Sequence, residues 1–154
     1  MLERLSFKGG SIPVMFGDDS FIRRVMSLTT SATVLVVEDD AATREMYRQA
    51  LAASGHRTIA VADGLGALRF IEGDRPDVIV LDLNLPSVGG HDVYREMRAH
   101  PETCDIPVVI VTGSDARDLE RNDFRFFLRK PVSPETLTRI VEDALHWPHP
   151  VVGV

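Results

Sequence analysis

The sequence has a single cysteine and no long apolar run, and each shortage excludes a class of protein. Cys104 has no partner for a disulfide within the 154 residues, and the five histidines lack the spacing of zinc ligands. No segment approaches the ~18 consecutive apolar residues of a membrane span, and no apolar stretch near Met1 resembles a secretory signal. We therefore expect a cytoplasmic protein without a membrane partner.

Basic residues are in the minority. The chain has 17 lysines and arginines against 23 acidic residues, which gives a formal net charge of −6. Because affinity for nucleic acids comes largely from basic side chains that neutralise phosphates, we expect no nucleic-acid partner. The composition, 44% hydrophobic and 26% charged, is that of a globular protein long enough for one domain with one core.

The two ends of the sequence lack a sustained hydrophobic period. Residues 1–31 mix Gly, Pro and Ser with charges, which predicts a poorly structured N-terminal extension. Residues 148–154 contain prolines and a glycine and predict a C-terminal tail. The folded domain is therefore expected over residues 32–147.

Between these ends, short β-branched or aromatic runs alternate with helical stretches. Strands are predicted over residues 33–37, 57–62, 77–81, 106–111 and 124–128, and helices over 41–54, 65–72, 91–99 and from Ser133 onward. In the first helix Met46, Ala50 and Ala53 are expected to form the buried stripe, and Gly55 ends it. The alternation predicts an α/β fold, a doubly wound parallel sheet with helices on both faces.

Polar side chains follow four of the predicted strands at their carboxyl ends, the edge at which ligands bind to parallel sheets. In chain order they are Glu38, Asp39 and Asp40, then Asp82, Thr112 and Lys130. Clustered carboxylates repel one another unless a cation lies among them, and oxygen ligands suit Mg²⁺. With a metal and an ammonium group to offset charge, a carboxylate can attack phosphorus and form an aspartyl phosphate.

Each of these residues also has a purely structural interpretation. Asp40 directly precedes a helix and equally predicts an N-cap, while Asp82, Thr112 and Lys130 would be a turn cap, a strand end and a solvated charge. Their joint occurrence along one edge is much rarer by chance, which favours the functional interpretation.

The glycines indicate no nucleotide-binding loop. The patterns G-x-x-x-x-G-K-[ST] and G-x-G-x-x-G are both missing, and the pair Gly89–Gly90 predicts a turn. Cys104 and Trp147 are interpreted as structural residues without a chemical role.

The segments VLVVEDD, PDVIVLDLNLP, PVVIVTGSD and FFLRKP occur in this order, and residues 33–146 resemble the receiver domain of bacterial two-component response regulators. The interval between Asp82 and Thr112 and the Lys-Pro pair after the fifth strand both match that family. The resemblance implies a flavodoxin-like sheet with strand order 2-1-3-4-5. It implies that Asp82 accepts a phosphoryl group and that Mg²⁺ is held by Glu38, Asp39, Asp82 and the main-chain carbonyl of Asn84.

The resemblance also implies roles for three residues late in the chain. Thr112 and Lys130 would bind the phosphoryl group, and Phe127 stands where the family places a switch aromatic, although it is equally a core residue. The donor would be a histidine kinase or a histidine phosphotransfer protein, and phosphorylation would alter docking of an unknown downstream protein. Enzymatic activity would be at most self-phosphotransfer and autodephosphorylation, and a homodimer is left open.

Two departures from the family pattern keep alternatives open. The interval from Thr112 to Lys130 is about one helical turn short, which predicts a shortened or irregular fourth helix. This departure favours a non-phosphorylated pseudo-receiver that binds proteins, whereas the intact Asp82, Thr112 and Lys130 disfavour it. No output domain fits after Trp147, so a stand-alone receiver or one cut from a larger chain is expected. A Mg²⁺-dependent phosphatase is disfavoured because Asn84, two residues after Asp82, cannot donate a proton as a general acid.

Overall fold

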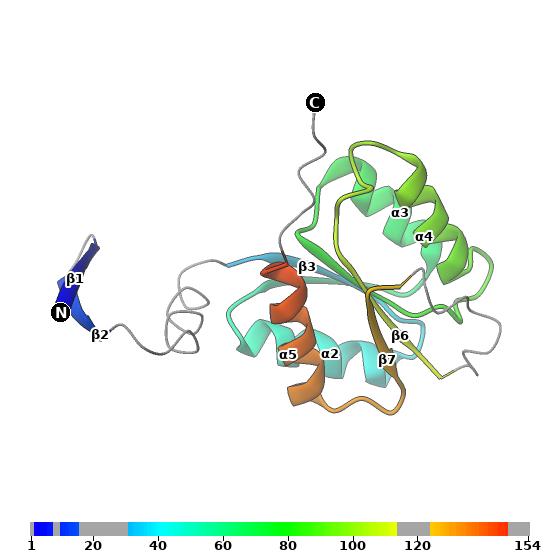
Figure 1. Cartoon of the computed structure of the whole chain (residues 1–154). Helices are drawn as coiled ribbons and strands as arrows, with labels where there is room; N and C mark the ends of the chain where they lie inside the picture. Colours follow the sequence, from blue (N-terminus) through cyan, green and yellow to red (C-terminus); the bar gives the residue numbers. More distant parts are fainter. Residues whose placement is uncertain (1, 8–9, 16–30, 114–123, 148–154) are drawn as a thin grey trace. The chain divides into compact units, whose positions relative to one another are not determined.

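The computed structural model describes residues 2–7, 10–15, 31–113 and 124–147, and the chain divides into two units, Met1–Thr30 and Ser31–Val154 (Figure 1). The first unit contains strand β1 (Leu2–Phe7), which pairs antiparallel with β2 (Gly10–Met15). Both strands lie within residues 1–31, for which the sequence predicts a poorly structured extension. Residues 1, 8–9 and 16–30 of that extension lie outside the described residues, so the expectation stays a prediction.

The second unit is built on a five-stranded parallel sheet. Its strands are β3 (Thr33–Val37), β4 (Arg57–Val61), β5 (Val78–Leu81), β6 (Val108–Thr112) and β7 (Phe126–Arg129). They lie in the spatial order β4-β3-β5-β6-β7, which confirms the predicted order 2-1-3-4-5 when β3 is counted first. Each strand begins and ends within about two residues of its prediction, the usual uncertainty at element ends.

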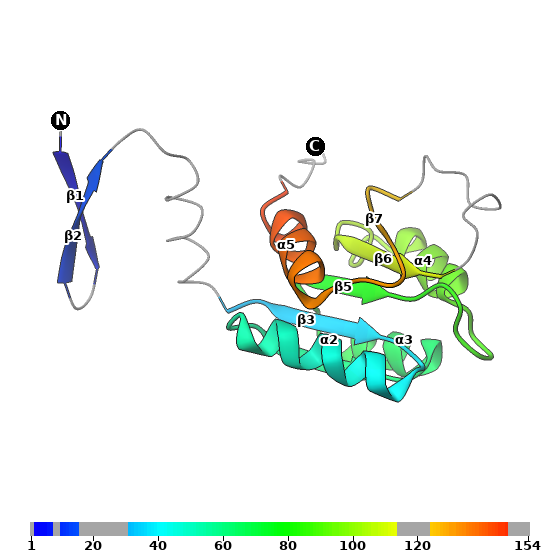
Figure 2. The same cartoon turned by 90° about the horizontal axis from the view of Figure 1, so that it is seen from below.

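Two helices cover each face of this sheet (Figures 1 and 2). Helices α2 (Ala41–Ala53) and α5 (Pro134–Leu145) lie on one face, and α3 (Gly64–Gly73) and α4 (Gly90–Ala99) lie on the other. Successive strand residues point to opposite faces, so β3 supplies Val34 and Val36 to the first layer and Leu35 and Val37 to the second. The doubly wound α/β fold is thereby confirmed.

The polar residues at the helix ends have the capping roles that their types favour. The side chains of Asp40, Asp63 and Ser133 accept hydrogen bonds from backbone amides in the first turns of α2, α3 and α5. Gly55 follows α2 with a φ of 91°, a conformation that costs glycine little. The predicted start and end of α2 and the predicted start of α5 are therefore confirmed at these residues.

The buried face of α2 differs from its prediction. Tyr47 and Leu51 are buried, whereas Met46 is 38% exposed and Ala53 is exposed. Neighbouring residues of a helix are turned about 100° from each other, so the helix is rotated by roughly one residue relative to the predicted stripe. Alanines lie on several faces of α2, so the hydrophobic pattern of its sequence does not define one buried face. The large side chains of Tyr47 and Leu51 determine which face is buried.

The shortened or irregular fourth helix that the family pattern implies between Thr112 and Lys130 falls on residues 114–123, outside the described residues. The predicted tail at 148–154 lies outside them as well. None of the helices within the described ranges combines the length and apolar character that a membrane span requires.

Candidate functional site

Three carboxylates meet where β3 and β5 end. Glu38 and Asp39 follow β3, and Asp82 follows β5, whose residue Leu81 pairs with Val37. One carboxylate oxygen of each of the three residues lies within 4.8 Å of the others. The side chains of Glu38 and Asp82 are buried, while Asp39 is exposed. The parallel register of neighbouring strands thus brings these side chains together, as their positions in the sequence predict.

The ammonium group of Lys130 lies between two of these carboxylates. Its Nζ donates to Oε2 of Glu38 at 2.6 Å and to Oδ2 of Asp82 at 2.8 Å. The backbone of Lys130 is fixed beside β6, because its amide donates to the carbonyl of Thr112 at 3.0 Å. One ammonium balances only one of the three carboxylates, so the cluster keeps an excess of negative charge.

Burial and hydrogen bonding shift the pKa values of this cluster in opposite ways. Burial raises the pKa of Glu38, although hydrogen bonds from Lys130 and from the amide of Asp40 oppose the shift. Burial also lowers the pKa of Lys130, but the hydrogen bonds to Asp82 and Glu38 outweigh it and raise the pKa above the ordinary lysine value. Lys130 therefore keeps its charge at neutral pH.

A residue of α2 fixes the backbone of the acidic loop after β3. The guanidinium of Arg44 donates to the carbonyls of Glu38 at 2.9 Å and Asp39 at 3.2 Å. The Oδ2 of Asp40 accepts from the amide of Thr43 at 2.8 Å, so its N-cap interpretation is confirmed. This role of Arg44 was not predicted from the sequence. Its only signal in the sequence is its position about one turn into the helix that follows the acidic run.

Asn84 and Thr112 form a second, polar wall beside Asp82. The amide of Asn84 donates to Oδ1 of Asp82 at 2.9 Å, and its side-chain Nδ2 donates to Oγ1 of Thr112 at 3.3 Å. Thr112 ends β6 and is fully buried. The main-chain amide of Asn84 therefore holds Oδ1 of Asp82, while Lys130 holds Oδ2. The bond from the Asn84 side chain to Thr112 is a contact that the sequence did not predict.

Glycine allows α4 to begin directly against the backbone of Asp82. A Cβ placed on Gly90 would lie 2.1 Å from the carbonyl oxygen of Asp82, a distance that no side chain tolerates. Gly89 is the N-cap of α4 and Gly90 its first residue. The predicted turn at this pair is therefore wrong, because the two glycines permit a close approach of helix and strand end instead.

This arrangement provides the donors that a hard cation prefers and a fixed ammonium group beside them. Carboxylate and carbonyl oxygens are the usual protein ligands of Mg²⁺, and three carboxylates within 4.8 Å fit such an ion. Asp82 is the carboxylate in contact with both Lys130 and Asn84. The site therefore combines three carboxylates, an ammonium group and a hydroxyl group on one edge of the sheet.

Residues 34–142 match the family model of the response regulator receiver domain. The chain belongs to this family. Receiver domains of response regulators act in two-component signalling, and they interact with histidine kinases and with downstream effectors.

Curated relatives of this receiver domain share one region with it. The response regulator MprA of Mycobacterium ulcerans is 38% identical over 86 residues, which cover 56% of this chain and 36% of the relative. MprA of Mycobacterium avium is 39% identical over 83 residues, or 54% of this chain and 36% of the relative. The matched region thus spans about a third of the length of these relatives.

Solved structures of receivers have the same fold over nearly their whole length. The chemotaxis response regulator CheY4 of Vibrio cholerae superposes with a TM-score of 0.69 at 28% identity, covering 75% of this chain and 99% of that chain. The receiver domain of the sensor histidine kinase PA1611 of Pseudomonas aeruginosa gives a TM-score of 0.68 at 29% identity, with coverages of 75% and 98%. The PA1611 structure has a magnesium ion coordinated in its active site cleft.

The structure of this receiver domain brings all but one of the predicted site residues together. Glu38, Asp39, Asp82, Asn84, Thr112 and Lys130 surround one edge of the sheet. Phe127 lies in the middle of the short strand β7 and packs, half-buried, against the core between the sheet and the α3–α4 layer. Its role as a switch therefore stays a prediction beside its place in the core.

Proposed function

We propose that this receiver domain accepts a phosphoryl group on Asp82 from a histidine kinase or a histidine phosphotransfer protein. Phosphorylation would then change the surface on which a downstream protein docks. On this proposal the chain acts in the cytoplasm, the reducing compartment that its lone cysteine, Cys104, suits.

The contacts of Lys130 carry this proposal. A charged ammonium group bonded to both Asp82 and Glu38 lies where negative charge would build up on a transferring phosphoryl group. Solvated lysines do not adopt this position, and a purely structural ion pair would not need a third carboxylate, Asp39, within 4.8 Å. The observed set thus supports phosphoryl transfer better than a structural role.

The transfer forms one bond at Asp82 and breaks one bond in the phosphohistidine donor. A carboxylate oxygen attacks the phosphorus of a phosphohistidine, and an acyl phosphate bond forms as the phosphorus–nitrogen bond breaks. The leaving imidazole keeps the electron pair and takes up a proton from water. The amide of Asn84 holds the other oxygen of Asp82 during the attack, and the ammonium of Lys130 moves from carboxylate to phosphoryl oxygen.

The cation site would be formed by Glu38, Asp39, Asp82 and the main-chain carbonyl of Asn84. Mg²⁺ bound there would offset negative charge on the phosphoryl oxygens. The three carboxylates supply oxygen ligands, and the exposed position of Asp39 leaves this side of the site accessible from solvent.

Thr112 and Phe127 would transmit the change to the surface. Thr112 is buried at the end of β6, and Val111 and Ile110 of that strand pair with Leu128 and Phe127 of β7. Movement of the Thr112 hydroxyl toward a phosphoryl oxygen would open space beside β7, which Phe127 can fill without leaving a buried polar group unsatisfied. The docking surface would then differ between the two states, as signalling by a population shift requires.

Incubation with Mg²⁺ and acetyl phosphate, followed by intact mass measurement, tests this proposal. We expect the mass of one phosphoryl group to be gained and to be lost in hydroxylamine, which cleaves acyl phosphates. Asp82→Asn should abolish the gain, whereas Lys130→Ala should reduce it without abolishing it.

Asp40→Asn is the matched control, because asparagine also caps helices and Asp40 lies outside the three-carboxylate cluster. It should be phosphorylated like the wild type. A wild-type chain that gains no mass would favour the protein-binding pseudo-receiver, and a gain in Asp82→Asn would move the acceptor to another residue.

A further inference from the structure

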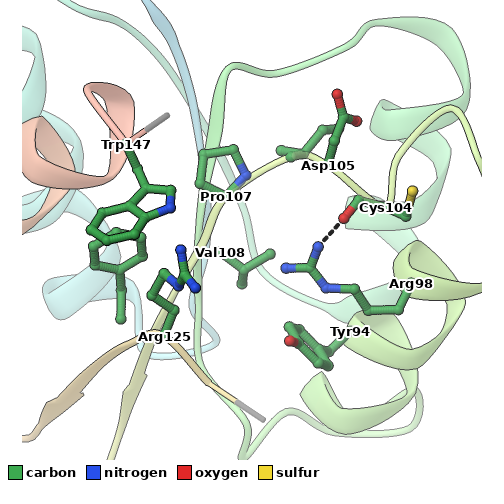
Figure 3. Close-up of a pocket in the computed structure, with 10 residues that line it drawn as sticks. Tyr94, Arg98, Cys104, Asp105, Pro107, Val108, Arg125 and Trp147 are labelled. Carbon is green, nitrogen blue, oxygen red and sulfur yellow. Dashed lines mark hydrogen bonds between the residues drawn. The ribbon is translucent and has the colours of Figure 1, made fainter. Parts of the chain in front are cut away.

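A pocket lies at the opposite end of the strands from the carboxylates. It has a volume of about 260 Å³ and lies where β6 and β7 begin. Its walls come from α4, from the loop before β6, from the start of β7 and from Trp147, which lies two positions after the end of α5 (Figure 3). The side chains that matter below are Tyr94, Arg98, Arg125, Phe126 and Trp147.

Two arginines enter this pocket from opposite walls, and the guanidinium group of each lies over an aromatic ring (Figure 3). The guanidinium carbon of Arg98 lies 4.9 Å from the centre of the Tyr94 ring, and Arg98 also donates to the carbonyl of Cys104. The guanidinium carbon of Arg125 lies 4.2 Å from the centre of the Trp147 ring. Stacking limits the freedom of both side chains before any ligand arrives, which lowers the entropy cost of binding.

The pocket is positive although the chain as a whole is negative. Among the described residues that line it, the acidic side chain is Asp105, which forms an ion pair with Arg75 at 2.7 Å. Within the described part of the chain, no carboxylate forms an ion pair with Arg98 or Arg125. A guanidinium group offers several donors in a planar fork that fits the oxygens of carboxylates and phosphates.

The rest of the lining is apolar and suits a flat ring. Ile106, Pro107 and Val108 line it between the two walls, and the edge-to-face contact of Phe126 with Trp147, at 6.2 Å between ring centres, fixes one side. Pockets that combine apolar walls with a few converging polar groups are the usual sites of small ligands.

We propose that this arginine pocket binds a small aromatic anion, a flat ring that carries a carboxylate or a phosphate group. The ring lies between the Trp147 and Tyr94 walls, and the acidic group accepts hydrogen bonds from Arg98 and Arg125. This function is separate from phosphoryl transfer, because none of the residues involved belongs to the carboxylate site.

Trp147 provides the measurement, because it is the only tryptophan of the chain. Titration with benzoate or phenyl phosphate should quench its fluorescence and saturate. Benzyl alcohol, which has the ring without the charge, and acetate and inorganic phosphate, which have the charge without the ring, should bind at least tenfold more weakly. Saturation with only one of the two aromatic anions also supports the proposal and identifies the acidic group that the pocket prefers.

Arg98→Gln and Arg125→Gln should each weaken binding of the aromatic anions at least fivefold. Arg95→Gln is the matched control, since Arg95 is an exposed arginine of the same helix that pairs with Asp92 outside the pocket. It should bind like the wild type.

Three outcomes would overturn the proposal. They are no saturable quenching by either aromatic anion, equal binding of the uncharged or ringless compounds, and equal affinity of the pocket and control variants. The comparison of ligands on the wild-type chain decides the question even where a variant fails to fold.

Discussion

The two ends of the parallel sheet hold charged groups in opposite ways. At the carboxyl ends of the strands, the side chains of Glu38 and Asp82 are only 2% and 4% exposed and depend on the ammonium of Lys130. At the amino ends, Arg98 and Arg125 are exposed and rest on aromatic rings. Burying a charge is costly unless it is paired, whereas an exposed charge on a ring costs little.

This difference predicts how much each end contributes to stability. The carboxylate site should respond strongly to any change of charge, because its groups are desolvated and coupled to one another. The arginine pocket should tolerate the loss of a charge, because water can replace the missing group.

Loss of Lys130 should have the largest effect. Lys130→Met leaves Glu38 buried without its cation, and we expect the free energy of unfolding at pH 7 to fall by about 2 kcal/mol. Because burial raises the pKa of Glu38 and Lys130 opposes the shift, the variant should raise that pKa further. The folded variant then binds a proton more readily than the unfolded chain, so its deficit should shrink as the pH falls toward 4.5, the ordinary value of Glu38.

Urea unfolding at pH 7 and pH 5 measures this effect. Arg48→Met, which breaks an exposed pair with Glu45 on α2, is the control and should leave stability unchanged at both values of pH. A Lys130→Met protein as stable as the wild type would show that the buried carboxylates do not need their ammonium partner.

Asp82→Asn should raise the free energy of unfolding, by less than Lys130→Met lowers it. The substitution removes one member of a crowded like-charge set, and we expect the free energy of unfolding without metal to rise by about 1 kcal/mol. Asp39→Asn should produce a smaller gain because Asp39 is exposed. Addition of Mg²⁺ should narrow the gap between Asp82→Asn and the wild type. Thermal unfolding in EDTA and in Mg²⁺ gives both comparisons, and an unchanged or lower stability of Asp82→Asn in EDTA contradicts the crowding argument.

Arg125→Gln should have the smallest effect of the three. Its stacking on Trp147 is exposed to solvent, so we expect the free energy of unfolding to stay within about 0.5 kcal/mol of the wild type. The same urea experiment measures it. A loss as large as that of Lys130→Met would mean that the arginine pocket is a structural element rather than a tolerant surface, and the contrast between the two ends would disappear.

The sheet and the carboxylate site were predictable because both have local signals in the sequence. Continuous apolar runs mark strands that are covered on both faces, and the polar residue after each run marks its carboxyl end. The parallel order then places Glu38 beside Asp82, although they are far apart in the chain.

Features that depend on packing were not predictable in the same way. The alanines on several faces of α2 left the burial of Tyr47 unpredictable from the hydrophobic pattern. The close approach of Gly90 to Asp82 has no counterpart in the periodicity of the sequence. The arginine pocket draws on α4, the start of β7 and the end of α5, three segments that share no motif. Trp147, assigned no role from the sequence, acquires one only when these segments meet.

The approach of α4 to Asp82 has a consequence for genetic screens. Gly90 performs no chemistry, yet even alanine would place a carbon atom inside the space of the Asp82 carbonyl oxygen. A screen that scores signalling alone would therefore place Gly90 in the same class as Asp82, the proposed acceptor. Only the amount of folded protein in each mutant would distinguish the loss of a reaction from a steric clash that prevents correct packing.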